Sequence, residues 1–266
     1  MDLGLRKKTA IVTGGASTIG KAIAEGFAKE NANVVVADVD KKQARRVVKT
    51  LNNMGDGEAI FIDTDVTDAS QVEKMASETL ERFGQIDILI NNAGWTANDL
   101  FLNKPVSDFE KEIAINLWGP INCIRSVAPA MIQRSYGKII TIGSDAGRVG
   151  EYQEAVYSAC KGGVNMLSKA LAREFGKHNL NINVVSPGLT LPESPDDAGD
   201  DSLWHKDSHQ SQIFQNEEVL KKVVRRYPLR RAAVPNDIVP IVLLLASDKS
   251  SYTTGQVISV SGGYAM

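Results

Sequence analysis

The sequence predicts a single α/β domain, residues 1–266, built on a doubly wound parallel sheet of seven strands with helices on both faces. Short runs of β-branched residues recur along the chain, and longer segments with the apolar period of a helix separate them. This alternation is typical of right-handed βαβ units, and 266 residues with 43% hydrophobic side chains suffice for one complete core.

Each strand is expected where apolar residues follow one another without interruption, as in Val34-Val35-Val36, because a strand covered on both faces has no polar side. Each helix is expected where apolar positions recur three and four residues apart. The expected strands are residues 10–12, 34–36, 60–62, 88–90, 139–141, 182–185 and 257–260, and the expected helices are residues 20–30, 41–52, 70–83, 107–134 and 156–177.

The composition excludes several classes of protein. With 30 Lys and Arg against 32 Asp and Glu, the chain has no basic field to hold nucleic acid or an anionic membrane. Its two cysteines, Cys123 and Cys160, stand alone, so neither a disulfide framework nor a zinc site is expected. Residues 1–8 contain no apolar run typical of a signal peptide or a membrane span, and we expect a cytoplasmic protein. His205 and His209 flank Asp207 without a further ligand pattern, and no metal site is expected.

One segment interrupts the alternation of strands and helices. Residues 189–218 are polar, acidic and rich in turn-forming residues, and they follow the carboxyl end of an expected strand. Ligands of open α/β sheets bind at that edge, so we expect a mobile lid over a substrate, the alternative being a tolerated surface insertion. The residues that give the segment its character are Pro192, Pro195, Asp196, Asp197, Asp200 and Asp201.

A glycine-rich loop, Thr13 to Gly20, follows the first expected strand and opens a helix. Glycines let the backbone approach a pyrophosphate, and the helix N-terminus supplies unpaired N–H groups. The second strand ends in Asp38, whose carboxylate would accept the hydroxyls of an adenosine ribose and repel a 2′-phosphate. These features favour NAD over NADP, although a plain turn and a solvated strand-end Asp38 remain alternatives.

The next two strands end in polar residues at the same edge of the sheet. Asp65 would accept a hydrogen bond from an adenine amino group, and Val66 would pack on its ring. Gly94, at the end of Asn91-Asn92-Ala93-Gly94, leaves space for a cofactor or a neighbouring backbone. The asparagines are also consistent with an ordinary turn.

Four polar residues form a candidate catalytic set. Tyr157 and Lys161 lie four residues apart and share one helix face, so the ammonium would favour the phenolate form of Tyr157 as a general acid/base. Ser144, at the end of the fifth strand, would hydrogen-bond the substrate oxygen. Asn116 would bend its helix and hold a water that links Lys161 to solvent.

These motifs, together with Pro187-Gly188, Gly255-Gln256 and Ser261-Gly262-Gly263, resemble the short-chain dehydrogenase/reductase family in order along essentially the whole chain. The resemblance implies a Rossmann-like strand order 3-2-1-4-5-6-7, NAD(P)-dependent interconversion of an alcohol and a ketone, and a homotetramer or homodimer. It also implies a catalytic tetrad of Asn116, Ser144, Tyr157 and Lys161. The cofactor-binding residues that follow are Gly14, Ser17, Thr18, Ile19, Gly20, Asp38, Asp65, Val66, Asn92, Ala93, Gly94, Tyr157, Lys161, Pro187, Gly188 and Thr190.

Within this resemblance Lys161 would also bind the nicotinamide ribose, and Thr190 would contact the carboxamide. The chain departs from the family at Thr18, which stands where the loop usually has its middle glycine. A β-branched residue has a narrower backbone range and adds bulk near the pyrophosphate, so the loop is not expected to keep the family's usual backbone path there. We expect cofactor binding to survive because the other landmarks are intact, with a weakened affinity as the alternative. The Thr18 hydroxyl would instead bond a phosphate or cap the helix.

The substrate is less clearly indicated. Residues 144–150, 154–157 and 255–263 are similar to the 2-hydroxycyclohexanecarboxyl-CoA dehydrogenase branch, which implies an alicyclic hydroxy substrate or its CoA thioester. Guanidinium groups suit phosphate, although a solvated helix end explains them equally, and the acidic segment would repel a polyanion unless it pairs with them. The candidate substrate contacts are Trp95, Ser144, Gln153 and Trp204, and the arginines are Arg225, Arg226, Arg230 and Arg231.

Two further classes of function stay open. The departure at Thr18 and the unusual segment 189–218 are also consistent with an NAD-binding regulatory protein without efficient turnover, and a structural oligomer subunit is the third reading. The helices expected at residues 107–134 and 156–177 carry abundant apolar positions and would form a dimer bundle.

Overall fold

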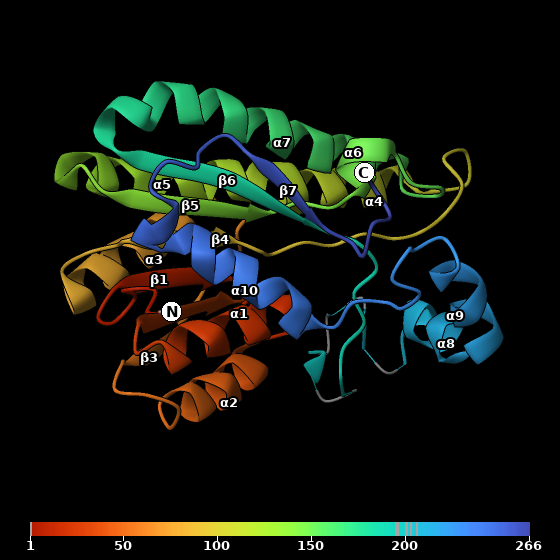
Figure 1. Cartoon of the computed structure of the whole chain (residues 1–266), viewed down its shortest axis with the longest axis horizontal. Coiled ribbons are helices and arrows are strands. Elements are labelled where there is room, and N and C mark those ends of the chain that lie inside the picture. The colour runs from red at the N-terminus through yellow and green to blue at the C-terminus, as the bar shows by residue number, and fades with distance from the viewer. Residues whose placement is uncertain (1, 195–196, 200–201, 203, 206) are drawn as a thin grey trace.

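The computed structural model of the protein describes residues 2–194, 197–199, 202, 204–205 and 207–266. Its centre is one parallel sheet of seven strands in the order β3-β2-β1-β4-β5-β6-β7 (Figure 1), so the expected strand count, direction and order are confirmed. The strands are β1 Thr9–Thr13, β2 Asn33–Asp38, β3 Ala59–Asp63, β4 Ile88–Asn91, β5 Gly137–Ile142, β6 Leu180–Pro187 and β7 Val257–Val260.

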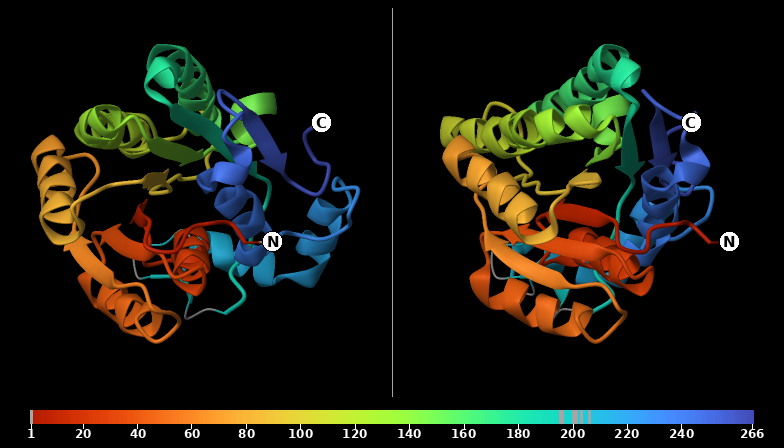
Figure 2. Two further views of the ribbon diagram at one scale, coloured as in Figure 1. Left: turned by 60° about the vertical axis from the view of Figure 1, so that its left-hand side comes forward. Right: turned by 90° about the vertical axis from the view of Figure 1, so that its left-hand side faces the viewer.

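Helices cover both faces of the sheet (Figure 2). Side chains of α1, α2 and α10 form one hydrophobic core with the sheet, and side chains of α3, α5 and α7 form the other. The helices are α1 Thr18–Lys29, α2 Lys41–Leu51, α3 Ala69–Phe83, α4 Val106–Ile113, α5 Gly119–Arg134, α6 Ala146–Val149, α7 Ala155–Phe175, α8 His209–Gln215, α9 Glu217–Val224 and α10 Pro235–Ala246. None of these described helices is long and apolar enough to cross a membrane.

Strand order changes direction between β1 and β4. The chain runs outward from β1 to β3 and then returns, so β4 pairs with the other side of β1, with Ile11 opposite Leu89. A crevice for a ligand forms at such a switch point, outside the carboxyl ends of the strands. The sheet therefore gathers the residues after β1, β2, β4, β5 and β6 at one edge.

The helix expected at residues 107–134 is not continuous. A π-helical segment, Ala114–Trp118, separates α4 from α5 and contains the buried Asn116. Such wide turns frequently mark functional sites, because they redirect one side chain without ending the helix. The expected bend of the helix at Asn116 is confirmed. The single helix expected at residues 107–134 is replaced by α4, the π-helical segment and α5. The structure also adds α10, whose internal Pro240 obscures its helical pattern in the sequence.

The segment 189–218 is only partly irregular, since it contains α8 and the start of α9, which lie together beside the sheet (Figure 1). Thr190 forms a parallel bridge with Ala233. Asp197 lies 2.5 Å from Lys21 of α1, and the Gly199 N–H donates to Ser17 Oγ at 3.3 Å. The described part of the segment thus contacts the glycine-rich loop, while the proposed contributions of Pro195, Asp196, Asp200 and Asp201 lie outside the described residues, and its mobility stays a prediction.

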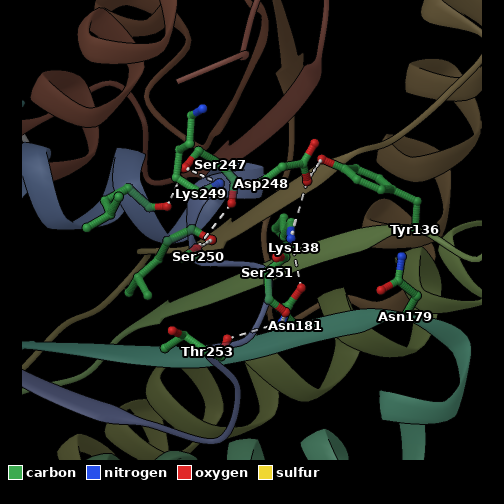
Figure 3. Close-up of polar contacts among 12 residues, drawn as sticks. Tyr136, Lys138, Asn179, Asn181, Ser247, Asp248, Lys249, Ser250, Ser251 and Thr253 are labelled. Carbon is green, nitrogen blue, oxygen red and sulfur yellow. Dashed lines mark hydrogen bonds and ion pairs between the residues drawn. The ribbon is translucent and has the colours of Figure 1, made fainter. Parts of the chain in front are cut away.

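The amino edge of the sheet carries a polar network of its own (Figure 3). Lys138, buried on β5, donates to Asn181 Oδ1 at 2.7 Å and lies 3.5 Å from Asp248, which also accepts from the Tyr136 hydroxyl at 3.1 Å. Asn181 in turn donates to the carbonyls of Ser251 and Thr253. These bonds fix the turn before β7 against β5 and β6 and satisfy a lysine whose pKa is lowered chiefly by burial.

The loop from β1 to α1 contains two residues with left-handed backbone, Gly14 at φ +61° and Thr18 at φ +43°. A side chain at such a φ costs about 1–2 kcal/mol, because Cβ crowds the following carbonyl. Ser17 occupies the N-cap position of α1, so the idea that Thr18 caps this helix is wrong. The loop keeps at Thr18 a conformation that glycine adopts without strain.

We therefore expect Thr18→Gly to raise the free energy of unfolding by about 1 kcal/mol, because relief of the left-handed strain exceeds the added freedom of glycine in the unfolded chain. Urea denaturation monitored by circular dichroism measures the change. Thr18→Ala is the matched control: it also removes the branched side chain but keeps Cβ, and it should recover less than half of the gain. A lower stability of Thr18→Gly would contradict the strain.

Candidate active site

Lys161, Asn116 and Gly94 meet at the carboxyl edge of the sheet. Lys161 is 4% exposed, and its ammonium donates to the carbonyl of Ile142 at 2.9 Å. A Cβ added at Gly94 would stand 3.1 Å from Asn116 Oδ1 and 3.6 Å from Lys161 Nζ. Gly94 therefore lies directly beside two of the four expected catalytic residues, and a side chain there would crowd Asn116.

Tyr157 and Ser144 complete the set. Tyr157 lies one turn before Lys161 on α7, and the Lys161 ammonium is 5.5 Å from the centre of its ring. Ser144 follows β5, accepts from the N–H of Ala146 at 3.1 Å and hydrogen-bonds Tyr157. The structure therefore brings together all four residues from three separate elements, π segment, β5 end and α7.

The electrostatics of this set differ from a simple ammonium–phenolate pair. Burial is the main cause that raises the pKa of Tyr157 above its usual range, the charge of Glu154 adds to it, and the hydrogen bond with Ser144 opposes it. Burial also lowers the pKa of Lys161 to about 8. In the free protein the phenol is therefore protonated at neutral pH, and its ionisation depends on positive charge that arrives with a ligand.

Asn116 is fixed by the backbone around it. Its amide donates to the carbonyls of Trp95 at 2.6 Å and Glu112 at 2.9 Å, and its Oδ1 accepts from the Trp95 N–H at 3.3 Å. These bonds tie the π segment to the chain after β4. The link from Asn116 through water to Lys161 stays a prediction.

The glycine-rich loop is braced by the residues after β4. Thr13 Oγ1 accepts from the N–H groups of Asn92 at 3.0 Å and Ala93 at 3.1 Å, and the Asn92 amide donates to the carbonyls of Thr13 and Gly14, both at 3.0 Å. A Cβ at Gly20 would stand 2.0 Å from the Gly14 carbonyl oxygen, so only glycine fits there. Asn92 and Ala93 thus shape the loop through hydrogen bonds within the protein.

Asp38 ends β2 beside this loop. Its carboxylate accepts from the N–H groups of Ala16 at 2.9 Å and Asp40 at 3.0 Å, while burial raises its pKa. The carboxylate is therefore held against the loop between β1 and α1, and its contact with an adenosine ribose stays a prediction. With the glycine-rich loop at the N-terminus of α1 and Gly94 beside Lys161, the described residues fit a nicotinamide dinucleotide.

The remaining expected cofactor residues lie along the same edge. Asp65 Oδ1 accepts from the N–H and hydroxyl of Thr67, and Val66 is buried beneath α5, where its carbonyl accepts from Asn122. Pro187 and Gly188 end β6, and the Thr190 hydroxyl donates to the Gly188 carbonyl at 3.1 Å. Contacts of these residues with adenine or carboxamide stay predictions, as do those of Ser17 and Ile19 at the start of α1.

The candidate substrate residues lie in different surroundings. Trp95 is half-buried with the Lys111 ammonium 4.1 Å from its ring centre, and Gln153 takes a left-handed backbone at φ +67°. Trp204 packs its ring against Phe214, with centres 5.8 Å apart, which is a contact inside the segment 189–218. A substrate contact by Trp204 stays a prediction, and its described role is packing.

Sequence reasoning missed a buried polar cluster behind the catalytic set. Lys104 and Glu112 form a fully buried ion pair, and Glu112 Oε1 also accepts from the hydroxyl of Thr96 at 2.8 Å. Asn98 donates to Glu154 Oε1 at 3.0 Å beside it. Only the eight-residue spacing of Lys104 and Glu112 at the start of a helix was visible in the sequence, and that spacing alone does not predict burial.

The arginine cluster is largely engaged within the chain. Arg231 binds Asp237 through two bonds of 2.5 and 2.7 Å, and Arg226 donates to the Tyr264 hydroxyl at 2.5 Å. Arg230 donates to the carbonyl of Arg225. The idea that the acidic segment pairs with these arginines is wrong for Asp197, which binds Lys21. Among the described residues, no group of three or more His, Cys, Asp or Glu is arranged to hold a metal ion.

Comparison with known proteins agrees with this site. A family model for short chain dehydrogenases matches residues 8–201. A 3-oxoacyl-[acyl-carrier-protein] reductase FabG of Staphylococcus aureus is 35% identical over 260 residues, which cover 97% of this chain and 98% of the relative. The FabG protein of Thermotoga maritima is 33% identical over 259 residues, with the same coverage of both chains.

A solved structure, a short-chain type dehydrogenase/reductase from Mycobacterium marinum, has a TM-score of 0.86 at 30% identity and covers 99% of this chain and 98% of its own. The relatives named above are reductases and dehydrogenases in general, not specifically members of the 2-hydroxycyclohexanecarboxyl-CoA dehydrogenase branch. The family match and the near-complete coverage lead to one conclusion: the chain belongs to the short-chain dehydrogenase/reductase family and is an oxidoreductase.

Proposed function

We propose that this protein is an NAD-dependent dehydrogenase that interconverts a secondary alcohol and a ketone. The observation that carries the proposal is the convergence of Ser144, Tyr157 and Lys161 beside Gly94, at the carboxyl edge of the sheet. A hydroxyl donor, a phenol and a buried ammonium are the groups that proton transfer at a carbinol oxygen requires. A nicotinamide bound at this edge supplies the hydride acceptor, or the donor in reduction.

In the direction of oxidation, the ionised Tyr157 takes the proton of the substrate hydroxyl, and Ser144 Oγ–H donates to the oxygen as negative charge develops on it. Lys161 stabilises the phenolate by its charge and, by the family resemblance, holds the nicotinamide ribose. Asn116 keeps the chain after β4 in place through its bonds with Trp95. In reduction Tyr157 returns the proton to the ketone oxygen.

Tyr157→Phe should lower kcat at least 100-fold, since loss of a positioned acid/base removes about 10²–10⁴ of rate. Steady-state absorbance at 340 nm over a panel of secondary alcohols and ketones measures the change, and fluorescence titration should show cofactor affinity within about twofold of the wild type. Tyr152→Phe is the matched control, because Tyr152 is 73% exposed in the same segment. Full activity of Tyr157→Phe would refute the mechanism.

The choice of NAD rests on Asp38, whose carboxylate lies beside the glycine-rich loop. Asp38→Asn should lower kcat/KM with NAD by about 10- to 100-fold relative to NADP, the range for loss of a hydrogen bond to a charged group. Kinetics with both cofactors provide the ratio. Asp63→Asn is the control, since Asp63 pairs in register with Asp38 on the next strand and binds Lys41 on the surface. A wild type that prefers NADP would contradict the assignment.

The substrate class follows from the relatives and the sequence together. The S. aureus relative is named for 3-oxoacyl groups on acyl carrier protein, and the local sequence similarity indicates an alicyclic hydroxy acid or its CoA thioester. Both contain a carbinol or ketone near a carboxyl carbon. A screen with free and thioester-linked hydroxy acids separates them.

A regulatory protein that binds NAD without efficient turnover is the second candidate. The left-handed Thr18 in the cofactor loop and the raised pKa of Tyr157 favour it, because the first changes the loop that would hold the cofactor and the second opposes abstraction of a proton from an alcohol. It requires cofactor binding with no change in absorbance at 340 nm across the same panel. Robust turnover excludes it.

We also propose that the protein is an oligomer, a homotetramer or homodimer, formed through the apolar side chains exposed around the π segment and α7. Trp118 is 55% exposed and Met166 57% exposed. We expect native mass spectrometry to give two or four times 28.8 kDa. Trp118→Asp should shift the mass toward the monomer, whereas Tyr252→Asp, at an exposed residue on the turn before β7, should not. A monomeric wild type would contradict the proposal.

A further inference from the structure

Glu154 is the N-cap residue of α7, three residues before Tyr157. Its Oε1 accepts from the Asn98 amide at 3.0 Å, and next to it the N–H of Asp99 donates to the Gln153 carbonyl at 3.3 Å. These bonds join the chain after β4 to the start of α7. The half-buried carboxyl group is therefore fixed close to the reacting end of the site.

The charged groups around Glu154 do not neutralise it. Glu151 and Glu112 are both carboxylates, and each is already bound, Glu151 to the Tyr264 hydroxyl at 2.5 Å and Glu112 to Lys104. Lys104 is the one cation that affects Glu154 among the causes of its shifted pKa, and it is engaged with Glu112. Burial, together with the two neighbouring carboxylates, raises the pKa of Glu154 to about 7.

The effect of Glu154 reaches the catalytic residue. Its charge is, after burial, the largest cause that raises the pKa of Tyr157, so the carboxylate acts on the phenol through low-dielectric surroundings. A substrate oxygen bonded to Tyr157 and Ser144 would lie in the same field. A second negative charge beside that oxygen would be repelled, while a neutral group or a hydrogen-bond donor would not.

We propose that Glu154 is a specificity-determining residue: its carboxylate, held by Asn98 one turn before Tyr157, disfavours substrates with a free carboxylate beside the reacting carbon. It favours substrates whose carboxyl carbon is masked as an ester, thioester or amide. This inference rests on the proposed dehydrogenase function and narrows its substrate class from hydroxy acids to their neutral derivatives.

The test compares the reduction of acetoacetate with that of its methyl ester at pH 8.5, with the preferred reduced cofactor at saturation. The wild type should prefer the ester, and Glu154→Gln should lower the ester-to-acid ratio of kcat/KM about tenfold, which corresponds to one pKa unit of charge interaction. Glu154→Asp retains the charge and should keep most of the preference. Glu151→Gln, which removes a neighbouring carboxylate bound to Tyr264, should keep the wild-type ratio.

The pH dependence of the ester-to-acid ratio distinguishes an effect of the Glu154 charge from a purely structural role of that residue. Glu154 is charged above its pKa of about 7 and neutral below it, so the wild-type preference for the ester should be full at pH 8.5 and largely lost at pH 5.5. Acetoacetate stays ionised over this range. In Glu154→Gln the ratio should change less with pH than in the wild type, because Lys161, whose pKa is about 8, still loses its charge over this range.

An ester-to-acid ratio and a pH dependence in Glu154→Gln that match the wild type would overturn the role of Glu154. If the wild type reduces neither ketone, the proposed reaction fails for these substrates. In that case calorimetry on the same variants, with cofactor bound, measures the dissociation constants of acetoacetate and its methyl ester. The ratio of these two constants, compared between the wild type and Glu154→Gln, then decides the role of Glu154.

Discussion

The hydrogen bonds between Thr13 and Asn92 position the whole candidate site. They join the end of β1 to the end of β4, the two strands between which the strand order reverses, and so fix the glycine-rich loop relative to Gly94. From Gly94 the chain continues to Trp95, whose backbone holds Asn116 and thereby the π segment. The hydrogen bonds of two side chains, at the point where the strand order reverses, thus determine where a dinucleotide would lie relative to the candidate catalytic residues.

Several charged side chains are buried at the candidate site, and they differ in how many hydrogen-bond and ion-pair partners the surrounding residues supply. Lys161 has one carbonyl partner in the described structure, that of Ile142, and Glu112 has a complete ion pair with Lys104. Breaking a buried pair by removing one partner typically costs about 3–5 kcal/mol, whereas a group with few partners can change its charge when a ligand arrives. The cluster around Glu112 is accordingly a rigid support, and Lys161, Tyr157 and Glu154 are the groups whose protonation responds to ligands.

Much of the fold was predictable because buried parallel strands carry short runs rich in apolar, β-branched residues, which are continuous in β2 and interrupted by single polar residues in β6 and β7. The candidate tetrad could be named from the sequence because the motifs that contain its members follow one another in the order of the family, and its catalytic role stays a prediction. The π segment was not, since Asn116 continues a helical pattern in the sequence. Nor were the partners of Asp197 and Glu154, because Lys21 and Asn98 are distant along the chain and only tertiary packing brings them together.

The polar network around Lys138 lies at the amino edge of the sheet, whereas the candidate active site lies at the carboxyl edge. Lys138, Asn181 and Asp248 secure the strands at the amino edge of the sheet, and none of the described residues of the segment 189–218 or of α9 binds these three side chains. The register of these strands at the amino edge therefore does not depend on those side chains of the segment 189–218, whose described contacts include those with Ser17, Lys21 and Ala233. For protein engineering, this makes the segment 189–218 the natural place to exchange substrate specificity on an otherwise unchanged scaffold.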